Sequence, residues 1–183
     1  MSRVGIFLAD GFEEIEGLTV VDILRRAGID ISMISINGKK KVTGAHGIAL
    51  DTDEDIVQCD PDKLDMLVLP GGMPGTTNLA ACEKLTEALK KADQEKRGIA
   101  AICAAPSVLG DLGFLKGKKA VCYPGFESGL TGVEVLAVPV VTDGHITTSR
   151  GMGTAIAFAL ELTKRLKDEE TAKQVSRSIL YNV

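Results

Sequence analysis

The sequence contains 183 residues, of which 45% are hydrophobic and 25% are charged, and its formal net charge is −4. This is enough chain to enclose one sizeable core, so we expect a single domain over residues 1–183. The basic residues cluster only at Lys39–Lys41. Such a short cluster in an acidic chain argues against direct nucleic-acid binding.

Membrane and metal signals are also missing from the residue pattern. The chain has no run of 18 apolar residues, and its first apolar run, Val4–Leu8, is too short for the core of a signal peptide. We therefore expect a soluble, cytoplasmic protein that does not bind membranes. The four cysteines form no CxxC pair and no zinc-ligand spacing with histidine, so we expect reduced thiols and no bound metal. They are Cys59, Cys82, Cys103 and Cys122.

Apolar periodicity predicts strands that alternate with helices along the chain. Short apolar runs, each followed by a glycine or proline, are typical of strands buried on both faces: Val4–Leu8, Ile31–Ile36, Met66–Leu69 and Ile99–Ile102. Helical periodicity covers Ile15–Ala27, Leu79–Lys96 and Gly153–Leu166. This alternation predicts an α/β fold with a mostly parallel sheet and helices on both faces.

Two segments break this alternation. Lys41–Asp53 predicts an extended excursion between the second and third strands. Val140–Ser149 has an Asp-Gly turn between two β-rich runs, so it predicts a small antiparallel hairpin. His145 follows that turn, and we expect its side chain to be exposed.

Cys103 is the strongest candidate for a reactive side chain, although an unpaired cysteine is by residue type more often a packing residue. It follows the run Ile99–Ile102 and precedes Ala104, Ala105 and Pro106, and proline suits the first position of a helix. Ligands of open parallel sheets bind beyond the carboxyl ends of the strands. A sharp strand-to-helix turn at that edge is typical of a nucleophile elbow. Since the helix N-terminus favours a thiolate, we expect an unusually acidic Cys103.

A glycine pair follows the neighbouring predicted strand. Gly71 and Gly72 come directly after Leu69 and Pro70 and permit backbone conformations that are closed to other residues. We expect both glycines to line the site, where a backbone N–H can bind an oxyanion. A simple tight turn is the alternative interpretation.

Three glutamates follow the first predicted strand. Glu13 and Glu14 fit ordinary first-turn carboxylates that complement a helix dipole. Glu16 lies where it could reach Cys103, and a partly buried carboxyl there would have a raised pKa and could act as a general acid or base. The two histidines, His46 and His145, both lie in predicted turns, so no Cys-His-Asp triad can be assembled from the sequence.

Five motifs occur in a fixed order over nearly the whole chain: ADGFEEIE, VDILRRAGI, LVLPGGMPG, AAICAAP and TSRGMGTAIAFAL. On these motifs the chain resembles the ThiJ/PfpI family, in its DJ-one-like subgroup. The resemblance implies a flavodoxin-like three-layer α/β sandwich. It also implies a homodimer with the first long helix at the interface.

The resemblance assigns roles to individual residues. It makes Cys103 an oxidisable nucleophile and Glu16 its protonated hydrogen-bond partner. The backbone N–H groups of Gly72 and Ala104 match the oxyanion-binding pair of the family. Arg150, in the TSRG motif, matches a position close to the site.

The chain departs from the family pattern at its histidines. Many members carry a His-Pro pair where this sequence has Tyr123-Pro124, and a tyrosine is a poor base at neutral pH. His46 aligns with a position that approaches the site of the partner subunit, so it is a substitute candidate. Ala104 replaces the histidine of the peptidase branch, and His145 lacks the His-x-Glu pattern of the amidotransferases, which disfavours both activities.

The resemblance implies a cofactor-free glyoxalase type III or deglycase that uses Cys103 on methylglyoxal-type dicarbonyls or their early adducts. The alternative is a redox-sensing or chaperone-like stress protein whose Cys103 is oxidised to sulfinic acid. A non-catalytic dimeric domain with a vestigial site is a third possibility. The same residues serve the first two functions, so the sequence leaves the choice open.

Overall fold

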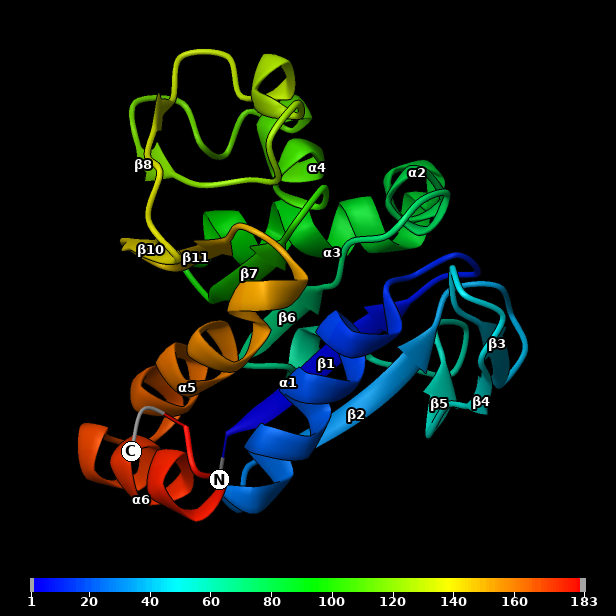
Figure 1. Ribbon diagram of the computed structural model, residues 1–183. Helices are drawn as coiled ribbons and strands as arrows, with labels where there is room; N and C mark the ends of the chain where they lie inside the picture. Colours follow the sequence, from blue (N-terminus) through cyan, green and yellow to red (C-terminus); the bar gives the residue numbers. More distant parts are fainter. Residues whose placement is uncertain (1, 182–183) are drawn as a thin grey trace.

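The computed structural model describes residues 2–181 and confirms the α/β architecture (Figure 1). The strands of the main sheet, in chain order, are β1 (Arg3–Leu8), β2 (Asp30–Ser35), β5 (Glu54–Asp55), β6 (Met66–Leu69), β7 (Gly98–Ile102), β10 (Val140–Asp143) and β11 (Ile146–Ser149). Their order across the sheet is β10-β11-β7-β6-β1-β2-β5, and every neighbouring pair except β10–β11 is parallel. The four strands predicted from apolar runs are therefore β1, β2, β6 and β7.

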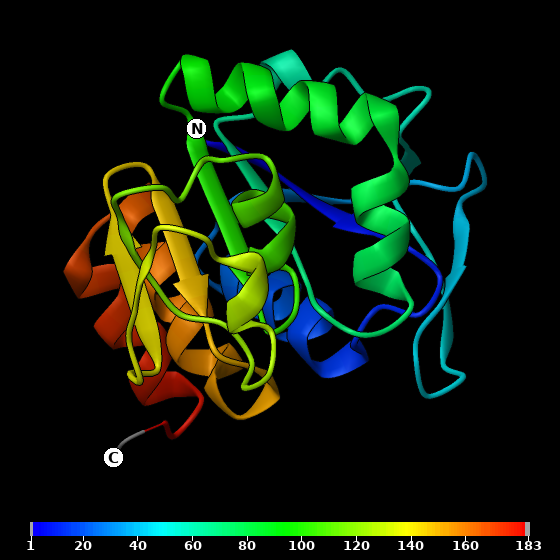
Figure 2. The same cartoon turned by 90° about the horizontal axis from the view of Figure 1, so that it is seen from above.

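Helices cover both faces of this sheet. On one face lie α1 (Glu14–Arg26) and α5 (Ala155–Leu166), with α6 (Glu169–Ser178) packed on α5. On the other lie α2 (Gly75–Ala81), α3 (Glu83–Gln94) and α4 (Pro106–Asp111). The view from above shows the three layers (Figure 2). Within residues 2–181, no helix is long and apolar enough to cross a membrane.

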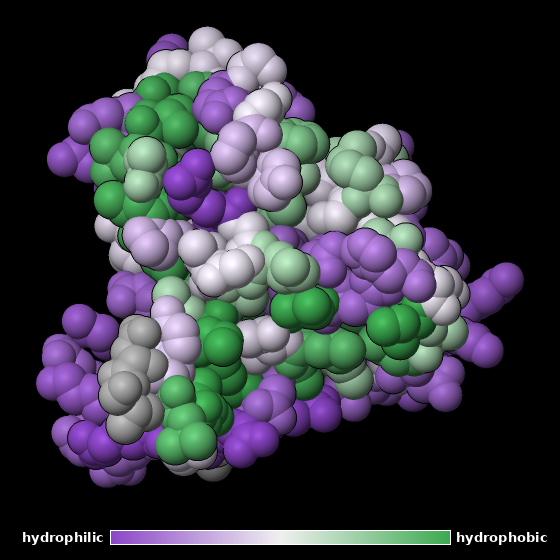
Figure 3. All heavy atoms as spheres, viewed as in Figure 1, coloured by the Kyte–Doolittle hydropathy of each residue, from purple (hydrophilic) through white to green (hydrophobic). Residues whose placement is uncertain are grey.

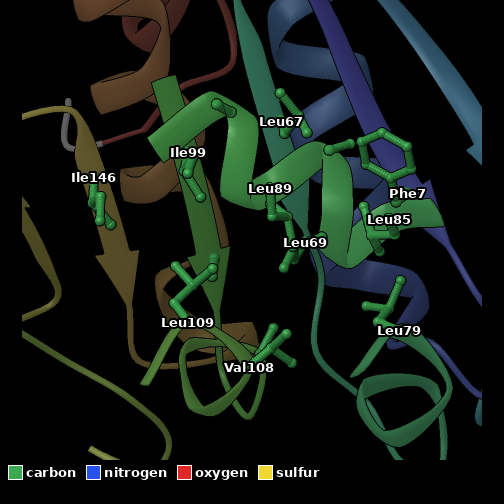
Figure 4. Close-up of a cluster of buried hydrophobic side chains, with 14 of the residues drawn as sticks. Phe7, Leu67, Leu69, Leu79, Leu85, Leu89, Ile99, Val108, Leu109 and Ile146 are labelled. Atoms are coloured by element: carbon green, nitrogen blue, oxygen red, sulfur yellow. The ribbon is translucent and has the colours of Figure 1, made fainter. Parts of the chain in front are cut away.

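The central strands are buried on both faces, as their apolar runs predict. Phe7, Leu67 and Ile99 face the helix layer that contains α3 and α4 (Figure 4). The residues that alternate with them, such as Ile6 and Val68, face α1 and α5. This alternation follows from the two-residue period of a strand, and it needs apolar side chains at every position.

The predicted helix over Leu79–Lys96 is wrong as a single element. Cys82 has extended backbone angles, φ −80° and ψ 101°, and separates α2 from α3. One continuous helix would place Leu79 and Leu85 about 120° apart around its axis. The break allows both leucines to be fully buried in the same core cluster.

The excursion after β2 forms β3 (Lys41–Thr43) and β4 (Ala49–Asp51), which pair antiparallel. A further short parallel pair is β8 (Lys119–Ala120) with β9 (Glu134–Val135). Both pairs lie outside the main sheet.

The predicted hairpin is confirmed as β10–β11, but the prediction that His145 is exposed is wrong. The His145 side chain is 9% exposed, and its Nε2 lies 2.8 Å from Oδ1 of Asp93 in α3. The backbone carbonyl of His145 accepts a hydrogen bond from the Ile99 N–H at 3.0 Å. The turn therefore packs against the end of α3, because β11 continues the main sheet beside β7.

Candidate functional site

Cys103 occupies the turn from β7 to α4 with a backbone φ of +66°. This left-handed conformation is uncommon for a residue other than glycine and stores strain. Two hydrogen bonds hold it: the Cys103 N–H donates to the Ser149 carbonyl at 3.0 Å, and the Tyr123 N–H donates to the Cys103 carbonyl at 2.8 Å. The sequence-predicted elbow is therefore a strained turn braced by β11 and by the segment after β8.

The turn after β6 brings Gly71 and Gly72 to the same place. Gly72 has φ +91°, and a Cβ there would lie 2.6 Å from the Gly11 carbonyl oxygen, so only glycine fits. At Gly71 a Cβ would lie 2.7 Å from Glu16 Oε2 and 3.0 Å from Cys103 Sγ. The missing side chain at Gly71 is thus what leaves room for the carboxyl and the sulfur to meet.

Glu16 projects from α1 into this space and is 1% exposed. Its Oε2 accepts a hydrogen bond from the Gly71 N–H at 2.9 Å, and its carboxyl is also hydrogen-bonded to the Cys103 thiol. Burial raises the pKa of Glu16 to about 7, against the lowering effect of these hydrogen bonds. The raised pKa predicted for a buried Glu16 is confirmed.

The ionisation of Cys103 differs from the prediction. Burial, then the charge of the Glu16 carboxylate and the hydrogen bond to it, raise the pKa of the thiol to about 12. Hydrogen bonds from the Ala104 and Gly72 N–H groups oppose this rise. The expected unusually acidic thiol is therefore wrong when Glu16 is ionised. The helix α4 has only 6 residues and begins with a proline, which has no N–H, so it offers the sulfur few free N–H groups.

Glu16 and Cys103 titrate as a coupled pair. When the carboxyl holds the proton, its negative charge no longer opposes the thiolate, and its O–H can donate to the sulfur. The pKa of Glu16, about 7, keeps a large part of the carboxyl protonated at neutral pH. A thiolate at Cys103 is therefore linked to a protonated Glu16.

A cavity of about 600 Å³ opens above the sulfur. It is lined by most of the residues that the sequence predicts for the site: Glu16, His46, Gly72, Cys103, Tyr123 and Arg150. Gly71 and Ala104 lie beside it and contribute backbone N–H groups. Glu13, Pro124 and the segment 151–154 also line the wall and were not predicted from the sequence as site residues. The TSRGMGT motif was the available signal for that segment.

His46 reaches the cavity because a buried carboxylate anchors its loop. The Glu14 carboxylate accepts hydrogen bonds from the His46 N–H at 2.8 Å and the Ile48 N–H at 3.4 Å, and it lies 2.9 Å from His46 Nδ1. Burial pushes the pKa of Glu14 up, but these hydrogen bonds outweigh it and leave the pKa below its ordinary value. The hydrogen bond to Glu14 and the nearby charges of Glu13 and Glu14 raise the pKa of His46.

The exposure expected of His46 is confirmed, since its side chain is 67% exposed. It also lines the cavity of its own chain. Its approach to the site of a partner subunit, which the resemblance implies, stays a prediction. Tyr123 stands at the rim, about half exposed, with its ring edge-on to Phe126.

Three potential metal ligands lie together at this rim. Donor atoms of Glu13, Glu14 and His46 fall within 4.8 Å of one another. However, the Glu14 oxygens already accept hydrogen bonds from the loop that carries His46. The cluster is explained as a loop anchor, and we assign no metal to it.

The sheet edge and the cavity define the class of protein: an α/β protein with a cysteine on a nucleophile elbow. Comparison with known proteins is more specific, since the profile of the DJ-1/PfpI family matches residues 2–165. The chain belongs to this family. The solved structure titled "Toxoplasma gondii DJ-1, oxidized" superposes with a TM-score of 0.96 at 34% identity, covering 100% of both chains.

Two curated relatives show how far the similarity extends. Protein DJ-1 homolog A of Arabidopsis thaliana is 39% identical over 176 residues, 94% of this chain and 45% of that protein. The chain thus spans less than half of the plant protein. A protein of Pyrococcus abyssi named a deglycase is 34% identical over 167 residues, 90% of this chain and 99% of its own length.

Proposed function

We propose that this protein is a cofactor-free glyoxalase and deglycase that uses Cys103 on methylglyoxal-type dicarbonyls or their early adducts. One observation carries the proposal: the sulfur lies on a strained turn, hydrogen-bonded to the buried Glu16 carboxyl, in a cavity that can hold a small carbonyl compound. The deglycase name of the Pyrococcus relative supports the same class of reaction.

The first step is addition of the Cys103 thiolate to the aldehyde carbon of methylglyoxal. A C–S bond forms, the C=O double bond opens, and its oxygen becomes an oxyanion. The Gly72 and Ala104 N–H groups, which hydrogen-bond the sulfur in the free protein, donate to this oxyanion. Glu16 then gives its proton to the oxygen, which produces a hemithioacetal and a free carboxylate.

The second step moves a proton between the two carbons. The Glu16 carboxylate removes the C–H proton of the hemithioacetal and returns it to the neighbouring carbon, while the hydroxyl proton moves to the neighbouring oxygen. The first carbon is oxidised to a thioester and the second is reduced to an alcohol, so no external oxidant or reductant is needed. Water then adds to the thioester, the C–S bond breaks, and lactate and the thiol are released.

The test is lactate formation from methylglyoxal. We expect the wild type to form lactate and Cys103→Ser to form none. Glu16→Gln should form lactate at least roughly 100-fold more slowly than the wild type, because general acid–base catalysis contributes about that factor. Cys82→Ser, which removes a half-buried thiol outside the cavity, is the matched control and should retain activity. Absence of lactate with the wild type would refute the enzymatic function.

A redox-sensing role is the second candidate, and it rests on the same donors. The Gly72 and Ala104 N–H groups and a protonated Glu16 can each hydrogen-bond an oxygen on an oxidised sulfur. The Toxoplasma relative is described in its title as oxidized. Treatment with dilute hydrogen peroxide followed by mass spectrometry should add two oxygens to Cys103. If neither lactate nor sulfinic acid forms, the site is vestigial.

We further propose that the protein acts in the cytoplasm as a homodimer, without nucleic-acid or membrane ligands. Apolar side chains gather over α1 (Figure 3), where Ile15, Leu18 and Ile48 are 51%, 37% and 56% exposed. They line a groove of about 540 Å³ that ends beside Glu14. Burial of such a face by a second copy would account for its composition. Sedimentation equilibrium, with Leu18→Glu as the disrupting variant, tests the dimer.

A further inference from the structure

Arg150 is a cationic wall residue of the Cys103 cavity whose side chain has no hydrogen-bond acceptor among residues 2–181. It follows β11, is half-buried, and lines the cavity. Its backbone N–H donates to the Pro139 carbonyl at 3.3 Å. Among residues 2–181, its guanidinium group makes neither a hydrogen bond nor an ion pair, although it carries five N–H donors. An arginine in this setting is available to bind an anionic ligand.

The backbone around Arg150 is tied to the reacting groups. Ser149, directly before it, accepts the Cys103 N–H at 3.0 Å. At Gly151, directly after it, an added Cβ would lie 3.9 Å from Glu16 Oε1 and 3.1 Å from the Tyr123 ring. The backbone of Arg150 therefore lies next to the reacting groups, and its side chain lines the same cavity as Cys103.

The other charges of the cavity restrict the kind of anion. Glu13 and Glu14 pair with His46, at 3.6 and 2.9 Å, and so they already balance its charge. Glu13 and the single negative charge shared by the coupled pair Glu16 and Cys103 lie in the same wall as Arg150, and together they would repel a dianion such as a phosphate monoester more strongly than a monoanion. A single planar guanidinium matches a carboxylate, which it can bind through two parallel hydrogen bonds.

We propose that Arg150 selects carboxylate-bearing α-oxoaldehydes, so that the preferred substrates are anionic rather than the neutral methylglyoxal. This proposal rests on the proposed function and deepens it. A suitable probe is 4,5-dioxopentanoate, in which two methylene groups join the dicarbonyl to a carboxylate. The thiol adds to its aldehyde carbon, the proton shift and hydrolysis follow as above, and 2-hydroxyglutarate is released with uptake of one water.

The kinetic test is the ratio of kcat/KM for 4,5-dioxopentanoate to that for methylglyoxal. We expect the ratio to be roughly 10 or more in the wild type and to fall roughly 10- to 100-fold in Arg150→Gln, as for loss of a charge-assisted hydrogen-bond pair. Arg150→Lys, which keeps the charge but loses the planar fork, should give an intermediate ratio. Arg177→Gln, which removes an exposed arginine of α6, is the control and should keep the wild-type ratio. An unchanged ratio in Arg150→Gln would overturn the proposal.

A binding test separates this proposal from the proposed function. Levulinate has the same carboxylate and ketone but lacks the aldehyde, so it can occupy the cavity without reacting. We expect levulinate to slow iodoacetamide labelling of Cys103 in the wild type. The neutral amide of levulinate should need at least a roughly 10-fold higher concentration for the same protection, and in Arg150→Gln the two compounds should protect equally. If neither dicarbonyl is turned over but this pattern is found, the glyoxalase function fails and the carboxylate site stands. Equal protection by levulinate and its amide would refute the site.

Discussion

Replacing Glu16 by glutamine removes a buried acid whose ionisation opposes folding. The carboxyl has an ordinary pKa of 4.5 in the unfolded chain and about 7 in the folded protein. Between these values the unfolded chain has released its proton while the folded protein still holds one, so the free energy of unfolding of the wild type falls as pH rises through this window. The pKa difference corresponds to about 3 kcal/mol, nearly all of which is lost by pH 8.

The assay is urea unfolding of the wild type and Glu16→Gln at pH 5 and pH 8. Glutamine cannot ionise, so the stability of Glu16→Gln relative to the wild type should increase by about 2 to 3 kcal/mol between the two pH values. The exposed Glu134, changed to glutamine, is the control for loss of one carboxylate. A difference that is independent of pH, or that decreases as pH rises, would refute the assignment of a raised pKa to Glu16.

Three further predictions test the turns and the histidines. Gly72→Ala should lower the free energy of unfolding by about 1 to 3 kcal/mol because of the positive φ, and by a further amount because the new Cβ collides with the Gly11 carbonyl. It should also lower lactate formation. Gly113→Ala is the control in urea unfolding, because Gly113 has φ +81° but open space around it, so this variant measures the backbone cost alone. His46→Ala should lower the rates of lactate formation and of peroxide oxidation of the thiol, and unchanged values of both would exclude a role for this imidazole. His145→Ala should destabilise the protein by about 1 to 3 kcal/mol, because it removes the 2.8 Å contact to Asp93 Oδ1 and leaves that oxygen only the longer ion pair with Lys96, at 4.0 Å. A thermal unfolding midpoint equal to that of the wild type would contradict this.

Much of the fold can be predicted from the residue pattern because strands and helices require different spacings of apolar residues. Uninterrupted apolar runs specify strands covered on both faces, and β6 begins and ends at the predicted residues. The hairpin follows from an Asp-Gly turn between β-rich runs. The break at Cys82 escaped prediction because no proline or glycine marks it; it exists because Leu79 and Leu85 must reach one core from two helices.

The site was predictable where a residue type is demanded by the backbone. Gly72 is an example, since its positive φ and the nearby Gly11 carbonyl admit no side chain. The elbow at Cys103 follows similarly from the end of an apolar strand before Pro106. By contrast, the burial of His145 against Asp93 depends on how a hairpin turn meets a helix far away in the sequence.

Which groups meet at this edge of the sheet follows from the residue order, because parallel strands end there and the residues that follow them must converge. The ionisation of those groups depends on the folded arrangement. A cysteine before a helix suggests an acidic thiol, but the pKa depends on burial and on the charge of Glu16, a residue 87 positions away in the chain. The tertiary structure likewise placed the Arg150 side chain in the wall of the same cavity, with no hydrogen-bond partner for its guanidinium group among residues 2–181. Solvation and charge act through space, so no local pattern of residues contains them.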